Sequence, residues 1–185
     1  MTDELQGRKI AFLVASGVEQ IELTGPWDAV RNAGGTPVLV SPEDGHVQAF
    51  NGDVEKGDTF PVGVELRAAE SADYAGLVLP GGTTNPDKLR TIRDAVDFAA
   101  SFRRHEKPVA AICHGPWTLV EADVVRGKQL TSWPSLQTDI RNAGGEWQDS
   151  EVVVCRRDGW TLVTSRNPGD LPAFIRELTA AFAVV

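Results

Sequence analysis

Short runs of apolar residues alternate along the chain with segments of helical periodicity. Four of these runs are apolar throughout and have the length of a strand; they occupy residues 10–15, 37–40, 76–79 and 109–112. A strand that is apolar at every position is typical of a sheet covered on both faces. These four segments therefore predict the buried strands of a parallel sheet.

Helical segments follow the predicted strands. Apolar residues recur at i, i+3, i+4 and i+7 from Ala95 to Phe102, which predicts a helix over residues 94–104. A helix over residues 26–33 would carry Pro26 in its first turn, a position that proline favours. Further helices are expected at residues 134–143 and 171–182.

Two regions carry weaker β signals. Residues 152–154 and 161–164 flank Asp158-Gly159, a pair typical of turns, and predict a β-hairpin. Residues 44–68 alternate weakly between apolar and polar positions and are compatible with a small β excursion. A short strand is also expected between Lys128 and Trp133.

Alternating strands and helices define the fold class. The order predicts an α/β protein, a flavodoxin-like three-layer sandwich with a mostly parallel central sheet. The chain of 185 residues contains no linker, repeat or low-complexity tract, so residues 1–185 are expected to form a single domain.

Composition and charge narrow the classes of function. The net charge is −8, and no block of basic residues offsets it, so no nucleic-acid partner is expected. No run approaches the roughly 18 apolar residues of a membrane span. Residues 1–8 are polar and acidic, unlike a signal peptide, and the expected location is cytoplasmic. The sequence shows no metal-binding cluster or phosphate-binding loop, and we therefore expect no metal and no cofactor.

The segment around Cys113 carries the clearest chemical signal. A buried strand runs directly into Cys113, and His114, Gly115 and Pro116 then lead into an apolar helix. Strand, sharp turn and helix form the geometry of a nucleophile elbow. A helix N-terminus favours a thiolate and lowers a cysteine pKa, here from an ordinary value of about 8.5. The alternative is that Cys113 merely ends a buried strand.

Two other strand ends are expected at the same edge of the sheet. Gly81 and Gly82 follow the strand at 76–79, and the amide of Gly82 is a candidate oxyanion donor together with that of His114. Glu19 and Glu22 follow the first strand, before the helix expected at Pro26. Each feature also has a plain structural reading, as a glycine turn or as acids preceding a helix.

Taken in order along the chain, IELTGP, LVLPGG, ICHGP and the segment TSWPSLQTDIRNAGGEW resemble the ThiJ/PfpI superfamily, in particular its PfpI-type intracellular protease and general-stress-protein branch. The resemblance covers residues 9–182. It implies a flavodoxin-like fold and a homodimer or hexamer. It also implies Cys113 as nucleophile with His114 beside it, and Glu22 as a protonated carboxyl next to the sulfur. An acid from a neighbouring subunit would approach the histidine, and its motif position corresponds to Asp87.

The chain departs from the family pattern at three places. Asp87 is one methylene shorter than the family's glutamate, in a loop with an extra residue, which weakens the case for an intersubunit triad. Trp133 stands where some members have tyrosine, and Trp117 replaces glutamine and is expected to narrow the crevice. Glutamine amidotransferases, which need a late His-x-Glu, are excluded because no histidine follows His114.

Three functions are compatible with these residues. The first is a stress-response enzyme of the glyoxalase or deglycase type, in which Cys113 attacks small carbonyl compounds. The second is a cysteine peptidase or amidase acting on peptides. The third is a redox-sensing stress protein or chaperone that responds through oxidation of Cys113. The substrate is accordingly a small-molecule carbonyl or a peptide. Cys155, in an apolar strand, is expected to be an inert thiol.

Overall fold

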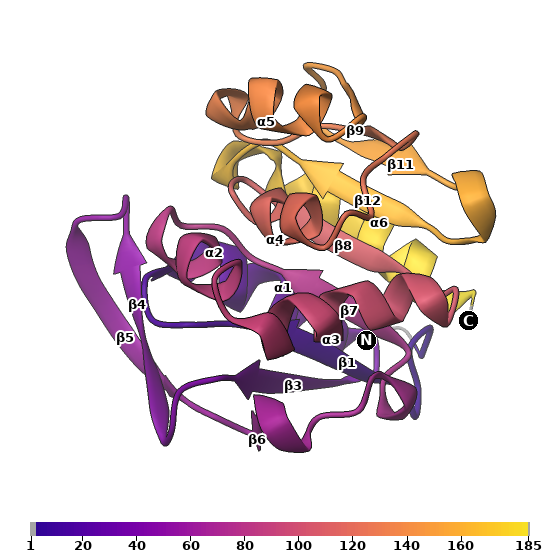
Figure 1. Ribbon diagram of the computed structural model, residues 1–185. Helices are drawn as coiled ribbons and strands as arrows, with labels where there is room; N and C mark the ends of the chain where they lie inside the picture. The colour runs from indigo at the N-terminus through magenta and orange to yellow at the C-terminus, as the bar shows by residue number, and fades with distance from the viewer. Residues whose placement is uncertain (1–2, 185) are drawn as a thin grey trace.

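The computed structural model describes residues 3–184 and is built on a seven-stranded sheet (Figure 1). All neighbouring strands of this sheet are parallel except the pair β11 and β12, which is antiparallel. The mostly parallel central sheet expected from the sequence is therefore confirmed. The strands lie in the order β11 (Val153–Cys155), β12 (Leu162–Ser165), β8 (Val109–Ile112), β7 (Gly76–Leu79), β1 (Lys9–Leu13), β3 (Thr36–Ser41) and β6 (Val64–Glu65).

Helices cover both faces of the sheet and make the three layers. Figure 1 shows α1 (Gln20–Asn32) and α6 (Leu171–Ala183) behind the sheet. The front face carries α2 (Thr84–Leu89), α3 (Arg93–Arg104) and α4 (Pro116–Glu121), and α5 (Gln137–Asn142) lies beside the short parallel pair β9 (Gln129–Leu130) and β10 (Glu146–Trp147).

Each central strand buries side chains on both faces. In β1, Ala11 and Leu13 pack with the core under α3, whereas Ile10 and Phe12 pack with the core under α1 and α6. All four side chains are fully buried. This double burial is the reason that the strands read as continuous apolar runs, and β7 and β8 occupy the residues that the pattern predicts.

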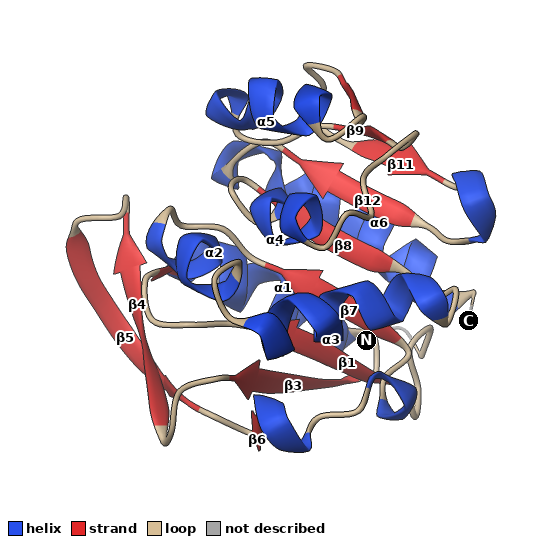
Figure 2. Cartoon of the chain, viewed as in Figure 1, coloured by secondary structure: helices blue, strands red, loops and turns tan. Residues whose placement is uncertain are grey.

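A β-hairpin projects from the edge of the sheet, on the left in Figure 2. Its strands are β4 (His46–Asn51) and β5 (Glu55–Pro61), and β2 (Val18–Glu19) adds to β4 as a third, parallel strand. This arrangement resolves the ambiguous segment 44–68 as a β excursion. The hairpin tip, residues 51–54, reaches the side of the molecule where the central strands end.

The first helix starts earlier than proline placement predicts. α1 begins at Gln20, directly after β2, so Pro26 lies inside the helix and Glu22 lies in its first turn. The expected start at Pro26 is therefore wrong. Leu23 and Val30 are buried against the sheet, and this tertiary packing outweighs the hydrogen bond that an interior proline removes.

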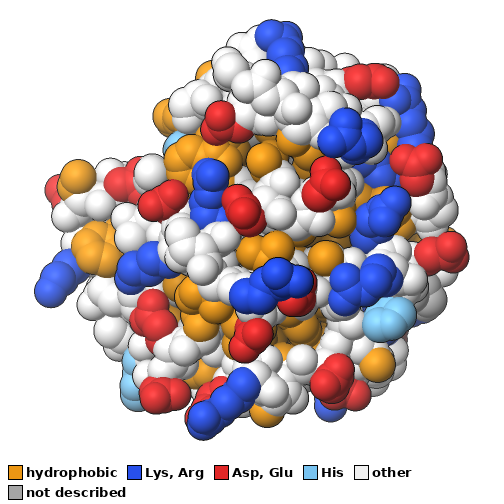
Figure 3. Space-filling view, in the orientation of Figure 1, with side chains coloured by type: hydrophobic (Ala, Val, Ile, Leu, Met, Phe, Trp, Pro, Cys, Tyr) orange, Lys and Arg blue, Asp and Glu red, His pale blue; other side chains and the backbone are white. Residues whose placement is uncertain are grey.

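The other helices and the C-terminal hairpin follow the sequence closely. The segment expected as a helix at 134–143 begins as a 3-10 turn at Pro134–Leu136 and continues as α5. The β11–β12 hairpin pairs Val153 with Thr164, as its turn signal predicts. No helix among the described residues is long and apolar enough to cross a membrane. On the face drawn in Figure 3, acidic and basic side chains are interspersed, and no continuous basic surface forms there.

Candidate active site

Cys113 sits in a strained turn at the end of β8. Its φ angle is +61°, in the left-handed region that side-chain-bearing residues rarely adopt. Its amide donates to the carbonyl of Ser165 at 3.0 Å, and its carbonyl accepts from the amide of Trp133 at 2.9 Å. A Cβ on Gly115 would lie 2.3 Å from the carbonyl oxygen of Leu79, so only glycine lets the chain turn there. The elbow expected from the sequence is present.

His114 lies beside the thiol rather than pointing away from it. Cys113 Sγ and His114 Nδ1 are 3.2 Å apart, and His114 Nε2 lies 3.4 Å from the hydroxyl of Ser135. The imidazole stacks on Trp133, with centroids 5.7 Å apart, and tilts against Trp117 at 5.2 Å. Burial lowers the pKa of His114, so the ring is neutral near pH 7 and Nδ1 can accept a proton.

Glu22 approaches the sulfur from α1. Its side chain is fully buried, and Oε2 accepts a hydrogen bond from the amide of Gly81 at 2.8 Å. The other oxygen, Oε1, has no hydrogen-bond partner among the described residues. Burial raises the pKa of Glu22 to about 8, and the hydrogen bond from the Gly81 amide opposes this effect. The carboxyl is therefore mostly protonated at neutral pH and can donate to the sulfur. Of the two glutamates, Glu22 is the one that lies next to Cys113, with Gly81 packed against both.

Gly81 holds the two reacting side chains together. A Cβ at this position would lie 2.5 Å from Glu22 Oε2 and 2.6 Å from Cys113 Cβ. Both are closer than real Cβ contacts allow, so the backbone itself fills the space between the carboxyl and the thiol. Gly81 does not line the cavity, and its contribution to the site is the hydrogen bond that its amide donates to Glu22.

The thiol pKa moves in the direction opposite to the one expected. Burial of the sulfur raises the pKa of Cys113, while the amides of His114 and Gly82 favour the thiolate. The predicted lowering relied on the helix that follows, but α4 has only six residues, and Cys113 is 6% exposed. The resting thiol is protonated, and any attack by sulfur requires a base to accept its proton.

A cavity of about 330 Å³ opens onto this arrangement. Five residues predicted at the site line it, together with Trp133, which was named as a departure from the family pattern, and three residues that the sequence did not indicate. The expected ones are Glu19, Glu22, Gly82, Cys113 and His114, and the others are Gly52, Asp53, Trp133 and Pro168.

The hairpin tip supplies two of the unforeseen residues. Gly52 donates its amide to Glu19 Oε2 at 2.9 Å. Asp53 accepts at Oδ1 from the amide of Thr83 at 2.6 Å and at Oδ2 from the Thr83 hydroxyl at 2.9 Å. These bonds fasten the hairpin over the end of β7. Nothing in the local sequence of the tip signals this placement, because its partners are distant in sequence.

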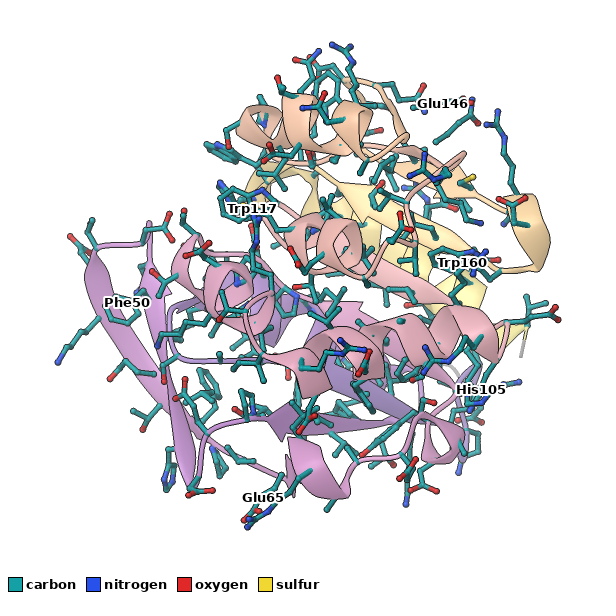
Figure 4. The ribbon with its side chains drawn as sticks, in the orientation of Figure 1. Phe50, Glu65, His105, Trp117, Glu146 and Trp160 are labelled. Atoms are coloured by element: carbon teal, nitrogen blue, oxygen red, sulfur yellow. The ribbon has the colours of Figure 1, made fainter. Side chains whose placement is uncertain are left out.

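Besides Gly81, two expected site residues do not line the cavity, namely Trp117 and Asp87. Trp117 packs on the outer side of His114, where its Nε1 donates to Asp139 at 2.8 Å and the Arg90 guanidinium lies over its ring at 5.3 Å. Figure 4 shows it beside α4, between α2 and α5. The expectation that Trp117 narrows the crevice is therefore wrong, and Trp133 is the tryptophan that lines it. Asp87 is exposed on α2 and is not among the lining residues.

Cys155 lies outside the site. It is buried in β11, and its sulfur accepts a hydrogen bond from the amide of Gln129 at 3.4 Å. Among residues 3–184, no group of three or more His, Cys, Asp and Glu side chains is arranged to hold a metal ion.

Comparison with known proteins places this geometry in a family. The DJ-1/PfpI family matches residues 8–181. Protein/nucleic acid deglycase 2 of Escherichia coli is 41% identical over 171 residues, covering 92% of this chain and 95% of the relative. General stress protein 18 of Bacillus subtilis is 38% identical over 175 residues, covering 94% and 97%.

A solved structure agrees with the sequence relatives. DJ-1beta of Drosophila melanogaster superposes with a TM-score of 0.82 at 26% identity, covering 99% of this chain and 91% of that one. The match in sequence extends over nearly the whole chain, and the match in structure includes the sheet and both helical layers. The chain belongs to the DJ-1/PfpI family.

Proposed function

We propose that this protein is a cytoplasmic stress-response enzyme that uses Cys113 as a nucleophile on small reactive carbonyl compounds, as a glyoxalase or deglycase. The observation that carries the proposal is the pairing of the Cys113 thiol with a neutral His114, 3.2 Å away, on one side and a protonated Glu22 on the other. This arrangement offers a nucleophile, a base and an acid within one small cavity.

The first step is addition of the thiol to an aldehyde. As the sulfur–carbon bond forms, the carbonyl π electrons move to oxygen, and His114 Nδ1 accepts the thiol proton. The amides of Gly82 and His114 and the protonated Glu22 face the sulfur, so they are placed to donate to the oxygen that develops charge. Return of the proton from His114 to that oxygen gives a hemithioacetal with no net loss of atoms.

The second stage converts the hemithioacetal of a 2-oxoaldehyde into a hydroxy acid. A base takes the proton from the carbon attached to sulfur, and the neighbouring carbonyl carbon receives a proton. The hydroxyl of the hemithioacetal gives its proton to the neighbouring carbonyl oxygen, so the carbon attached to sulfur becomes the carbonyl of a thioester and its neighbour carries the new hydroxyl. Water then cleaves the thioester and regenerates the thiol. The sum for methylglyoxal is addition of one water to give lactic acid, so no external oxidant or reductant is needed. A deglycase would reach the same thioester after releasing the amine or thiol of a glycated molecule.

The names of the relatives support this chemistry. One is named a deglycase of proteins and nucleic acids, and another is named a general stress protein. The size of the cavity suits small carbonyl groups better than an extended peptide, because it holds about 330 Å³ and is closed on one side by the Trp133 ring.

The test is to locate the covalent intermediate. The protein is mixed with methylglyoxal without glutathione, quenched in acid and digested, and the adducts are mapped by mass spectrometry. We expect an adduct on the peptide that contains Cys113 and none on the peptide that contains Cys155. Adducts confined to lysine, arginine and Cys155 would contradict the proposal.

A peptidase is the second candidate, since a Cys–His pair also serves amide hydrolysis. A raised thiol pKa and the absence of an acid on His114 Nε2 within the described residues make this reaction slower. A redox role is the third. The unpartnered Glu22 Oε1 could hydrogen-bond an oxidised sulfur, and mild peroxide would then place a two-oxygen adduct on Cys113 rather than on Cys155.

A further inference from the structure

The cavity around Cys113 is lined by three acidic residues and by no lysine or arginine among the described residues. The acidic residues are Glu19, Glu22 and Asp53. Glu22 is mostly protonated at neutral pH, because burial raises its pKa to about 8. Glu19 and Asp53 are the carboxylates that bring negative charge to the cavity, and Glu19 Oε2 accepts a hydrogen bond from the amide of Gly52.

Asp53 is held in place by contacts at both of its oxygens. The amide and hydroxyl of Thr83 each donate to it, and its φ angle of +65° is one that aspartate and asparagine tolerate better than most residues. Within residues 3–184, no lysine or arginine forms an ion pair with Asp53 or Glu19. The charge is thus fixed in position and is not neutralised by a cation.

The field of Asp53 reaches the reacting groups. Burial lowers the pKa of His114, and the Asp53 carboxylate opposes this effect. The same carboxylate adds to the rise that burial causes in the pKa of Glu22. Asp53 therefore acts on both groups that flank the sulfur. Glu22 also keeps one oxygen unpartnered and fully buried at the cavity wall. An anion entering the cavity would meet the fixed charge of Asp53, and no lysine or arginine among the described lining residues would pair with it.

We propose that Asp53 is a specificity-determining residue, which makes the Cys113 cavity reject carbonyl compounds that carry a carboxylate or phosphate and favour neutral or cationic ones. The inference rests on the proposed function for its substrate class, but the charge selection is a property of the cavity itself. Like charges across a small, partly desolvated cavity discriminate by about three- to tenfold even at a high effective dielectric constant.

The experiment compares two reagents of nearly equal size. Iodoacetamide is neutral and iodoacetate is anionic, and both alkylate a thiol. Their second-order rate constants at Cys113 are measured by mass spectrometry of its peptide, and the ratio of the two constants is compared among three proteins. These are wild type, Asp53→Asn and Asp44→Asn. Asparagine keeps the size of the side chain and suits the left-handed backbone, and Asp44 is an exposed residue away from the cavity that matches the change in net charge.

We expect the iodoacetamide-to-iodoacetate ratio to fall about three- to tenfold in Asp53→Asn and to stay within about twofold in Asp44→Asn. Added salt should also lower the ratio measured with wild type, and this test needs no variant. An unchanged ratio in Asp53→Asn, or an equal fall in both variants, would overturn the proposal, as would a wild-type ratio insensitive to salt.

The same proteins separate the two proposals. If methylglyoxal turnover is absent but the alkylation ratio responds to Asp53→Asn, the carbonyl function fails and the charge selection stands. If methylglyoxal turnover depends on Cys113 but the iodoacetamide-to-iodoacetate ratio is the same in wild type and Asp53→Asn, the carbonyl function stands and the charge selection fails.

Discussion

At the scale of single residues, Glu22 is a carboxyl group buried at a cost in stability. Its ordinary pKa is 4.5, and burial raises it to about 8 in the folded chain. A folded state that binds the proton more tightly than the unfolded state loses stability as the pH rises between these two values. Below pH 4.5 both states are protonated and the loss disappears. The protein therefore carries a pH-dependent penalty in return for a neutral acid beside the sulfur.

Replacement of Glu22 by glutamine should remove this penalty. Glutamine keeps an oxygen for the amide of Gly81 and a donor for the sulfur, but it does not ionise. We expect Glu22→Gln to have a stability advantage over wild type that is greater at pH 8 than at pH 5. The gain between these values is at most on the order of 4 kcal/mol, from about 1.4 kcal/mol per pKa unit. Urea unfolding at both values measures it, and a difference between the proteins that is independent of pH would contradict the assignment.

The site residues that could be predicted from the sequence lie in contiguous motifs, whereas those that could not be predicted are distant in sequence. Cys113 and His114 were found because strand, turn and helix are contiguous, and Glu22 was found from the family resemblance. Asp53 was missed because only the fold brings it to the cavity, and Trp133 was named only as a departure from the family pattern. Asp53 binds Thr83 across 30 positions, and the amide of Trp133 bonds the carbonyl of Cys113. The direction in which the pKa of Cys113 shifts could not be predicted from the sequence either, because it depends on the burial of the sulfur in the folded chain.

At the scale of elements, the β4–β5 hairpin is a strap over the end of the sheet. Its tip is exposed, yet it is tied to the loop after β7 by the two bonds between Asp53 and Thr83. One of these bonds uses a side-chain hydroxyl and can be removed alone. The hairpin thereby links the cavity wall to a loop that also carries Gly81 and Gly82.

Removal of the Thr83 hydroxyl should loosen the hairpin tip. Thr83→Val keeps the shape and the amide of the residue but loses the donor to Asp53 Oδ2. We expect faster amide hydrogen exchange at residues 51–54, with a loss of about 1 kcal/mol in the stability of the closed tip. Thr59→Val, an exposed change on the same hairpin, is the control. Equal exchange at the tip in the two variants would count against the strap.

The sequence predicted elements best where burial is uniform. The predicted bounds of β7 and β8 agree with the structure to the residue. Strands that are covered on both faces are apolar at every position, so the ends of the apolar run mark the ends of the strand. The start of α1 was missed, because a local rule for proline gave way to packing of Leu23 and Val30 against the sheet. The hairpin was ambiguous because exposed strands carry little apolar alternation; most of β5 is exposed.

At the scale of the whole molecule, the family resemblance leads us to propose a homodimer or hexamer, and Asp87 tests whether a second copy completes the site. Asp87 is exposed on α2, and in this chain it lies outside the cavity. An exposed substitution seldom changes the free energy of unfolding by more than about 0.5 kcal/mol, so the effect of Asp87→Ala on turnover reports mainly on catalysis. We expect methylglyoxal turnover within about twofold of wild type. A fall of more than tenfold, with oligomer size unchanged in sedimentation, would show that a neighbouring chain uses Asp87 at the site.

The central claim is that Cys113 performs carbonyl chemistry. The most direct measurement is lactate formation from methylglyoxal, without glutathione, by wild type, Cys113→Ala and Cys155→Ala side by side. Both variants remove one buried thiol, so Cys155→Ala controls for the loss of sulfur and of core packing. We predict turnover by wild type and Cys155→Ala and none by Cys113→Ala. Equal turnover by all three proteins, or none by wild type, would contradict the claim.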